Sequence, residues 1–496
     1  MLLTGNSAIA RGAYEAGVIL ATGYPGTPAS EVVEAAAELG IESQWSANEK
    51  VALEVAFGAS YGGARAISAM KNAGLNVASD PLLAISYTGV NAGLVIVVAD
   101  DPGPHSSQNE QDSRHYAMLA KVPMLEPSDS SEALALTVMA YNLSEKYDTP
   151  VLLRTTMRVA HSMSIVKQGS RTETKKEVRP DMHKYVLLPY HAKMRHLFVE
   201  DRLQRLEAHS ENLNSCEFRG KGMGIITSGV CYQYVREAFP EASVMKLNMT
   251  YPLSCRQVKA FAAEVKKLYV VEELDPFIEN QVRVMGLDPQ GKSLFPRTGE
   301  LNPAIVGSLG SGKKMDLITE HPSLCRGCHY HQVFRALRKT GAAVIGDVGC
   351  YTLGALPPHN CLQVQLNMGL SIGCLSGFEK ANPAKPAIAL IGDSTFIHSG
   401  ISSIINSRYT GSISTVVILK NGVAAMTGGQ PYPGSDSRRG IPQIDLVRLL
   451  NALDIVTDMI TPDRVEQTIM RHMSLKQMSA IIVDAPCKRP AYLSRG

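Results

Sequence analysis

Short runs of consecutive apolar residues recur along the whole chain, and helical stretches separate them. Examples are "GLVIVV" in the first third, "KLYVV" in the middle and "AIALIG" near the end. Strands that are buried on both faces of a parallel sheet show such continuous runs rather than alternation. Strands that alternate with helices predict a doubly wound α/β fold. A chain of 496 residues is also too long for one core, so several such domains are expected.

Changes in composition divide the chain into four predicted segments. An α/β domain is expected over residues 1–165, and a polar, basic stretch with a charged helix follows over 166–215, which we interpret as a linker. Two further α/β domains are expected over 216–311 and 312–496. The fold class predicted is therefore α/β, with three doubly wound units.

Composition excludes several classes of protein. The formal charge of +3 is small for this length and argues against nucleic-acid binding. We find no apolar run near the ~20 residues that a membrane span needs, and no secretory leader at the N-terminus. Nine cysteines in such a chain indicate a reducing compartment, so we expect a cytoplasmic protein whose thiols are free or bind metal.

The third α/β unit contains a candidate cation site. One apolar run ends in Gly392–Asp393–Ser394, and the next ends in Asn421, with 26 residues between Ser394 and Asn421. A carboxylate and an amide at neighbouring strand ends converge at the carboxyl edge of a parallel sheet, where such sheets bind ligands. With phosphate oxygens and water they would form a Mg²⁺ shell. On these residues alone, a strand-end Asp that caps the next helix is an equally good interpretation.

Glu49 is a candidate proton-transfer group in the first unit. It follows a predicted strand and begins a helix of small and apolar residues, "NEKVALEVAFGAS", so its carboxyl group can be buried. A glutamate in a first helical turn also complements the helix dipole, and without a second site this ordinary role would be preferred.

Several longer motifs occur in an order that resembles one family. They include "GYPGTPASEV", "NEKVALEVAFGAS", "VVEELDPFIENQV", "GDVGCYTLG" and "GDSTFIHSGI". The chain resembles the large (alpha) subunits of indolepyruvate ferredoxin oxidoreductases, within the 2-oxoacid:ferredoxin oxidoreductases. The resemblance implies pyrimidine-binding, transketolase C-terminal-like and pyrophosphate-binding domains. It also implies the conversion of an arylpyruvate and coenzyme A into aryl-acetyl-CoA, CO₂ and reduced ferredoxin.

The resemblance assigns roles to residues of both candidate sites. Glu49 matches the glutamate that activates thiamine diphosphate, and Thr27 matches a threonine near the thiazolium and the substrate carboxylate. Mg²⁺ ligation falls on Asp393, Asn421 and the carbonyl of Val423. Further cofactor contacts fall on Gly392, Ser394, Met426 and Thr427, and a pocket-facing loop on His105, Ser107 and Gln108.

Cysteines in the third unit match the ligands of a [4Fe–4S] cluster near the thiamine. They are Cys325, Cys328, Cys350 and Cys487. A Cys₄ zinc site uses the same ligands, but zinc accepts no electrons, so the redox interpretation fits the thiamine site better. The other cysteines are expected to be plain thiols: Cys216, Cys231, Cys255, Cys361 and Cys374.

The chain departs from the family's pattern around the expected site. Lys420 replaces an acidic residue, and Gly429 and Tyr432 replace two histidines. The usual ferredoxin-like extension is not found before Gly496, so electrons are expected to leave through a ferredoxin or ferredoxin-like protein. A beta-like subunit is also expected, in a hetero-oligomer. Two alternatives stay open: a non-oxidative thiamine-dependent decarboxylase or carboligase, and a non-catalytic subunit.

Overall fold

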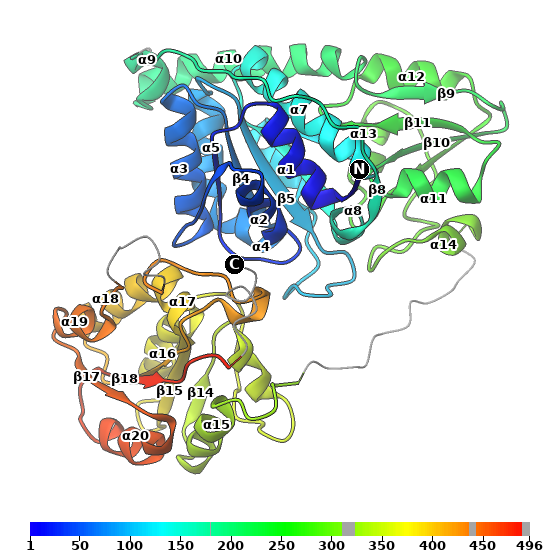
Figure 1. Cartoon of the computed structure of the whole chain (residues 1–496). Coiled ribbons are helices and arrows are strands. Elements are labelled where there is room, and N and C mark those ends of the chain that lie inside the picture. The colour runs from blue at the N-terminus through cyan, green and yellow to red at the C-terminus, as the bar shows by residue number, and fades with distance from the viewer. Residues whose placement is uncertain (179, 310–322, 436–442, 489–496) are drawn as a thin grey trace. The chain divides into compact units, whose positions relative to one another are not determined.

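The computed structural model describes residues 1–178, 180–309, 323–435 and 443–488 (Figure 1). The chain forms two compact units, Met1–Asp316 and Leu317–Gly496, and both are α/β, as predicted. Within the described residues, none of the helices combines the length and apolarity that crossing a bilayer requires.

A seven-stranded sheet forms the centre of the first unit. Its strand order is β12-β6-β7-β5-β4-β2-β3, and all neighbours are parallel except β12 and β6. The strands are β2 (Leu20–Gly23), β3 (Glu42–Trp45), β4 (Ala66–Lys71), β5 (Leu94–Asp100), β6 (Met124–Leu125), β7 (Val151–Thr156) and β12 (Met249–Tyr251). The helices of this part are α1 (Gly5–Glu15), α2 (Ser30–Glu38), α3 (Glu49–Tyr61), α4 (Asn72–Val77), α5 (Ser79–Thr88), α6 (Arg114–Ala120), α7 (Ser130–Tyr147) and α8 (Met157–His161).

Both faces of this sheet are buried, which explains the continuous apolar runs. Along β5, Val95 and Val97 belong to one apolar core, whereas Leu94, Ile96 and Val98 belong to the other. Successive side chains of a strand point to opposite faces, so a strand covered on both faces needs apolar residues at every position.

A second sheet in the same unit has the order β13-β10-β11-β9, with β9 antiparallel to its neighbour. Its strands are β9 (Ser215–Glu217), β10 (Met223–Ser228), β11 (Ser243–Leu247) and β13 (Lys267–Val271). The helices that follow are α11 (Cys231–Ala238), α12 (Cys255–Ala263), α13 (Phe277–Val284) and α14 (Pro303–Gly307). Strand β12 comes directly after β11 but pairs with β6 of the large sheet, so the chain ties the two sheets together.

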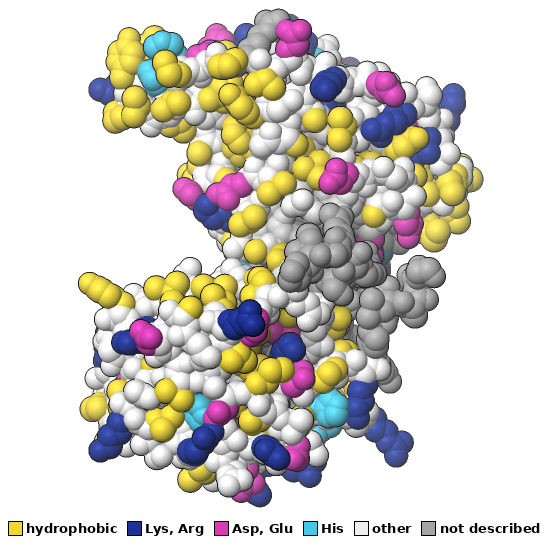
Figure 2. Space-filling model, turned by 60° about the vertical axis from the view of Figure 1, so that its left-hand side comes forward, with side chains coloured by type: hydrophobic (Ala, Val, Ile, Leu, Met, Phe, Trp, Pro, Cys, Tyr) yellow, Lys and Arg dark blue, Asp and Glu magenta, His cyan; other side chains and the backbone are white. Residues whose placement is uncertain are grey.

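The segment interpreted as a linker makes specific contacts. It contains α9 (Met182–Tyr185) and α10 (Pro189–Ser210), and just before it β8 (Met163–Ile165) pairs with β1 (Leu2–Thr4). In α10, Arg202 is fully buried and donates to the carbonyls of Lys121 and Asp148. Exposed apolar side chains gather over α9 and the first half of α10 (Figure 2). They are Met182, Val186, Leu187, Leu188, Tyr190, Met194 and Leu197.

The second unit contains a five-stranded parallel sheet of order β14-β15-β16-β18-β17. Its strands are β14 (Ala343–Ile345), β15 (Ala387–Gly392), β16 (Thr415–Lys420), β17 (Val456–Ile460) and β18 (Ser479–Asp484). Its helical elements are α15 (Tyr330–Lys339), η1 (Cys350–Ala355), α16 (Leu370–Ala381), α17 (Asp393–Thr395), η2 (Phe396–Gly400), α18 (Ile401–Tyr409), η3 (Ala425–Thr427), α19 (Leu446–Asn451), η4 (Pro462–Arg464) and α20 (Val465–Met473).

Candidate functional site

Asp393 lies at the carboxyl edge of the sheet in the second unit, directly after β15. Its carboxyl group is buried, and its two oxygens accept backbone N–H groups. Oδ1 accepts from Ser394 at 2.8 Å, and Oδ2 accepts from Gly422 at 2.8 Å. Gly422 belongs to the loop after β16, the neighbouring parallel strand. The structure therefore brings together the two strand ends at which the sequence predicts cation ligands.

Within the described part of the chain, the named hydrogen-bond partners of Asp393 are all neutral. Burial raises the pKa of this carboxyl, and the N–H groups of Gly422 and Ser394 and the hydroxyl of Tyr432 lower it in part. These donors are neutral, so the ionised carboxylate keeps its negative charge in a place that solvent does not reach. A bound cation would offset the free-energy cost of burying this charge, so Asp393 suits the role of a Mg²⁺ ligand.

Asn421 is held between two partners. Its Nδ2 donates to the hydroxyl of Tyr330 at 3.0 Å, and its Oδ1 accepts the N–H of Val423 at 3.0 Å. Gly422 between them has φ 78°, the left-handed region that favours glycine. The turn places the Asn421 amide, the Val423 peptide and the N–H that binds Asp393 in one loop. The predicted Mg²⁺ ligands Asp393, Asn421 and Val423 are thus neighbours.

The other predicted cofactor residues lie on the same edge. Ser394 is buried. Thr427 is in η3, where its hydroxyl donates to Gln430 Oε1 at 2.6 Å, whereas the side chain of Met426 is 52% exposed. At Gly392, an added Cβ would lie 2.8 Å from Cε1 of Tyr351, so glycine makes room for this ring. The sequence alone did not indicate this reason for a glycine at position 392.

The four predicted cluster cysteines gather beside this loop. Cys325 and Cys328 form a turn in which the N–H of Cys328 donates to the carbonyl of Cys325 at 3.1 Å. Cys350 begins η1, and Cys487 follows β18. The N–H of Cys487 donates to the carbonyl of Asn421 at 3.1 Å, which connects the thiols directly to the predicted Mg²⁺ loop.

Electrostatic coupling among the thiols indicates how close they are. Burial, with a smaller contribution from the other three thiols, raises the pKa of Cys350 to about 11. Burial also raises the pKa of Cys328, to which Cys325 and Cys487 add. Four thiols that repel one another's charge suit a cationic centre that binds thiolates.

The four thiols are not packed as closely as the ligands of a single zinc ion. Among the described residues, no three of the four sulfur atoms lie within 4.8 Å of one another. A tetrahedral zinc ion with Zn–S bonds of ~2.3 Å would hold its sulfurs about 3.8 Å apart. A [4Fe–4S] cluster binds each thiolate at a separate iron and spaces them more widely. The four cysteines are the ligand set of a [4Fe–4S] cluster, and in this structure they are less closely packed than the ligands of a zinc ion.

Glu49 is buried at the start of α3 in the first unit. Asn48 caps this helix, since its side chain accepts the N–H of Val51 at 2.9 Å. The carboxyl group packs against α4, where a Cβ added at Gly74 would lie 2.7 Å from both Cγ and Oε1 of Glu49. Any larger residue at position 74 would clash with the Glu49 side chain in this position.

Thr27 and the loop predicted to face the pocket are neighbours. The carbonyl of Thr27 accepts the hydroxyl of Ser106 at 3.2 Å. Ser107 Oγ is buried and has no hydrogen-bond partner within the described residues, and Gln108 is exposed. The contact to Thr27 thus comes from Ser106, which the sequence analysis did not select.

His105 lines a surface cavity of about 420 Å³. Its Nε2 is 3.5 Å from Oε2 of Glu300. The cavity is also lined by Met157, Arg158, His161, Ser162 and Glu300.

Lys71 is a site residue that the sequence analysis missed. It is the last residue of β4, and its ammonium group donates to the carbonyl of Ser106 at 3.0 Å. Burial lowers the pKa of Lys71, while the charges of Asp101 and Glu49 raise it. The polar end of the apolar run "AISAM" was the available signal, since ligands bind at strand ends.

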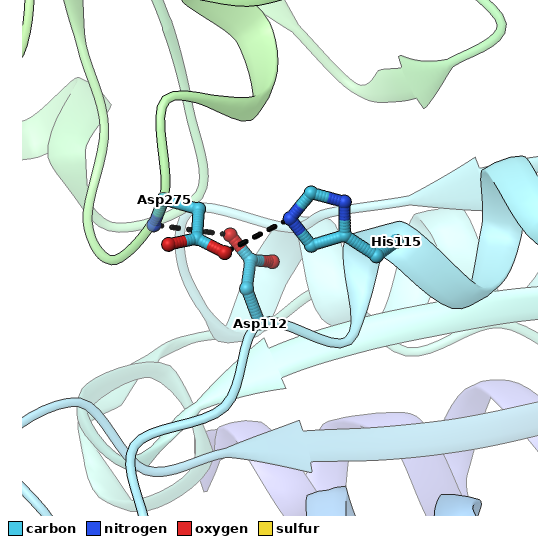
Figure 3. A group of neighbouring side chains, drawn as sticks. All are labelled: Asp112, His115 and Asp275. Atoms are coloured by element: carbon cyan, nitrogen blue, oxygen red, sulfur yellow. Dashed lines mark hydrogen bonds and ion pairs between the residues drawn. The ribbon is translucent and has the colours of Figure 1, made fainter.

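A separate group with the composition of a metal site comprises Asp112, His115 and Asp275 (Figure 3). His115 Nε2 lies 2.9 Å from Asp275 Oδ2. The carboxylate of Asp112, however, accepts Nε and Nη2 of Arg114, and this guanidinium neutralises it. Asp112 therefore differs from Asp393, whose named partners in the described residues are neutral.

Two family models match the chain. Residues 11–214 match the thiamine diphosphate-binding domain of pyruvate flavodoxin/ferredoxin oxidoreductases, and residues 347–484 match the C-terminal thiamine pyrophosphate-binding domain of thiamine pyrophosphate enzymes. Together they include Glu49, Asp393 and Asn421.

Curated relatives match over most of their length. Indolepyruvate oxidoreductase subunit IorA of Methanothermobacter thermautotrophicus is 37% identical, over 100% of this chain and 88% of that protein. The subunit IorA of Archaeoglobus fulgidus is 38% identical, over 88% of this chain and 77% of that protein. Among solved structures, the 2-oxoglutarate:ferredoxin oxidoreductase of Magnetococcus marinus has a TM-score of 0.51 at 19% identity, over 62% of this chain and 64% of that one. This last likeness supports the fold.

Proposed function

The chain belongs to the family of indolepyruvate oxidoreductase IorA subunits, thiamine diphosphate-dependent 2-oxoacid oxidoreductases, and we propose that its substrate is an aryl 2-oxoacid such as indolepyruvate. The products would be the aryl-acetyl-CoA thioester, CO₂ and two electrons for a ferredoxin. One observation carries the assignment of the site. The buried carboxylate of Asp393, whose named partners in the described residues are neutral, accepts a hydrogen bond from the loop that contains Asn421 and Gly422, and this loop is hydrogen-bonded to Cys487 of the thiol group.

Asp393, Asn421 and the carbonyl of Val423 would hold Mg²⁺ on the diphosphate of the cofactor. Thiamine diphosphate, when bound, supplies the electron sink for cleaving CO₂ from a 2-oxoacid. The carboxyl group of Glu49 would bind the ring nitrogen of the aminopyrimidine and exchange a proton with it. Its burial supports this role, because exclusion of water lets it share that proton with the ring rather than with solvent.

Cys325, Cys328, Cys350 and Cys487 would hold a [4Fe–4S] cluster, which accepts electrons one at a time. The electrostatic interaction among the four thiols supports the cluster. Cys325 is exposed, whereas the other three are half-buried, so the Cys325 side would face the electron carrier. We assign the carrier to a ferredoxin-like protein or domain.

A second, smaller subunit would complete the enzyme, because the relatives are themselves named as subunits. The exposed apolar side chains over α9 and α10 support such a partner, since apolar surface of this kind marks protein contacts.

Anaerobic purification followed by iron, sulfide and zinc analysis tests the proposed cofactors. We expect four irons and four sulfides per chain, and a reducible spectrum that is lost in Cys350→Ser. Reduction of ferredoxin with indolepyruvate and CoA should require the smaller subunit. Zinc, or no metal, at the four cysteines would contradict the redox function and favour a non-oxidative decarboxylase or carboligase.

A further inference from the structure

Lys71 lies among the groups that the proposed function places around the reacting carbon. Its stem packs on Gly26, where an added Cβ would lie 3.1 Å from both Cγ and Cδ of Lys71. Its ammonium group donates to the carbonyl of Ser106 at 3.0 Å, and the hydroxyl of Ser106 donates to the carbonyl of Thr27. Lys71 thus joins the Thr27 loop to the loop after β5.

On the basis of the proposed function, we propose that Lys71 binds the carboxylate of the 2-oxoacid substrate. A 2-oxoacid brings a negative charge to a site that already contains the carboxyl groups of Glu49 and Asp101, both buried. A cation between these acids and the substrate offsets the repulsion. Lys71 interacts electrostatically with both of them, and its ammonium group has three donors, one of which binds Ser106.

Unpaired donors beside Lys71 support this position. Asn72, the next residue, is fully buried, and its Nδ2 has no hydrogen-bond partner within the described residues. Ser107, next to Ser106, has a buried hydroxyl without a partner in the same described part of the chain. A buried donor without a partner costs free energy, and a carboxylate accepts several hydrogen bonds. The two residues follow Lys71 and Ser106 directly in the chain, and in the proposal a substrate carboxylate bound at Lys71 would accept their hydrogen bonds.

Steady-state kinetics of the assembled enzyme test the proposal through Lys71→Met. Loss of a charge-assisted hydrogen bond predicts a KM for the 2-oxoacid about 10- to 100-fold higher. The KM for CoA and the affinity for thiamine diphosphate should stay the same, and Lys71→Arg should restore part of the loss. Lys50→Met is the matched control, because Lys50 follows Glu49 but pairs with Glu54 on the exposed side of α3. This control should behave as the wild type.

A neutral substrate analogue measures the contribution of the substrate carboxylate to binding. The 2-oxoamide of the same acid should inhibit the wild type and Lys71→Met with equal Ki, whereas the acid should bind more weakly to the variant. The proposal would be overturned if the wild type and Lys71→Met had equal KM values for the acid. It would also be overturned if the variant lost affinity equally for the acid and the amide, or if the KM for CoA rose instead. Lys71→Gln repeats these measurements if the Met variant unfolds. Failure of the proposed function differs from all of these outcomes, because the wild type itself would then show no CoA-dependent reduction of ferredoxin with the 2-oxoacid.

Discussion

Two pairs of buried carboxylates in the first unit are held differently from Asp393 in the second. In the first unit, Asp112 and Glu272 both contact the guanidinium of Arg114, at 2.6 Å each. Asp100 and Glu126 contact Arg154 in the same manner, at 2.6 and 2.9 Å. In the second unit, Asp393 is held by the backbone N–H groups of Ser394 and Gly422.

The difference separates carboxylates that hold the fold from one that can bind a cation. Arg114 holds the pKa of Asp112 well below its usual range, so this charge is already matched within the protein. Burial raises the pKa of Asp393, and only neutral donors among its named partners oppose the rise. A buried carboxylate whose partners carry no charge is therefore the better candidate for metal binding.

Removal of Asp393 should have the largest effect. Asp393→Ala deletes the proposed ligand between Mg²⁺ and the diphosphate, so we expect no retained thiamine diphosphate and activity at background. Calorimetry with thiamine diphosphate and Mg²⁺ measures this. Asp463→Ala in η4 of the same unit, an exposed site, should bind as the wild type does. Thiamine diphosphate bound with unchanged affinity by Asp393→Ala would rule out the proposed metal site.

Glu49→Gln should lower kcat by about 10²- to 10⁴-fold, because the amide keeps a hydrogen bond but cannot exchange a proton. Cofactor binding should persist, which separates this carboxyl from Asp393. Glu54→Gln, on the exposed side of the same helix, is the control. A near-normal rate for Glu49→Gln would mean that another group activates the cofactor.

Gly74→Ala should lower kcat by up to about 10²-fold, because the added methyl group displaces the Glu49 carboxyl and misplaced catalytic groups lose rate steeply. Gly58→Ala is the matched control, since an added Cβ at this glycine of α3 contacts nothing within 4 Å. Equal rates in the two variants would show that Glu49 tolerates displacement.

The smallest effect is expected for Glu273 in the first unit, and it concerns the pH dependence of stability. Burial raises the pKa of Glu273 from its ordinary value of 4.5 to about 7, so ionisation costs stability as the pH rises through this window. Glu273→Gln cannot ionise, and we expect it to exceed the wild type in stability above pH 7 by at most about 3 kcal/mol. The difference should vanish below pH 4.5. Thermal unfolding at several pH values measures it, and an advantage that is independent of pH would contradict the assignment.

Much of this architecture could be predicted from local sequence. The apolar runs predicted the parallel sheets because burial on both faces leaves no polar position, and strand-end Asp393 and Asn421 meet because neighbouring parallel strands end together. Lys71 and Gly74 could not be found this way. Their importance depends on contacts with the Ser106 loop and with Glu49, which only the folded chain brings together.

The structural effects of the departures from the family's motifs also could not be predicted without the fold. Tyr432, which replaces a histidine, is buried and hydrogen-bonded to Asp393. Lys420, which replaces an acid, lies 3.7 Å from Asp484 at the end of the neighbouring strand. The first change therefore acts on the proposed metal ligand, whereas the second forms an ion pair between strand ends.

The hydrogen bond from Cys487 to the carbonyl of Asn421 has a thermodynamic consequence. If the cluster orders the segment around Cys487, it also orders the loop that would bind Mg²⁺, and the two cofactors then bind cooperatively. Such coupling is reciprocal: the factor by which the cluster tightens thiamine diphosphate binding equals the factor by which thiamine diphosphate tightens the cluster. Oxygen damage to the cluster should therefore release the vitamin cofactor, and saturation with that cofactor should protect the iron.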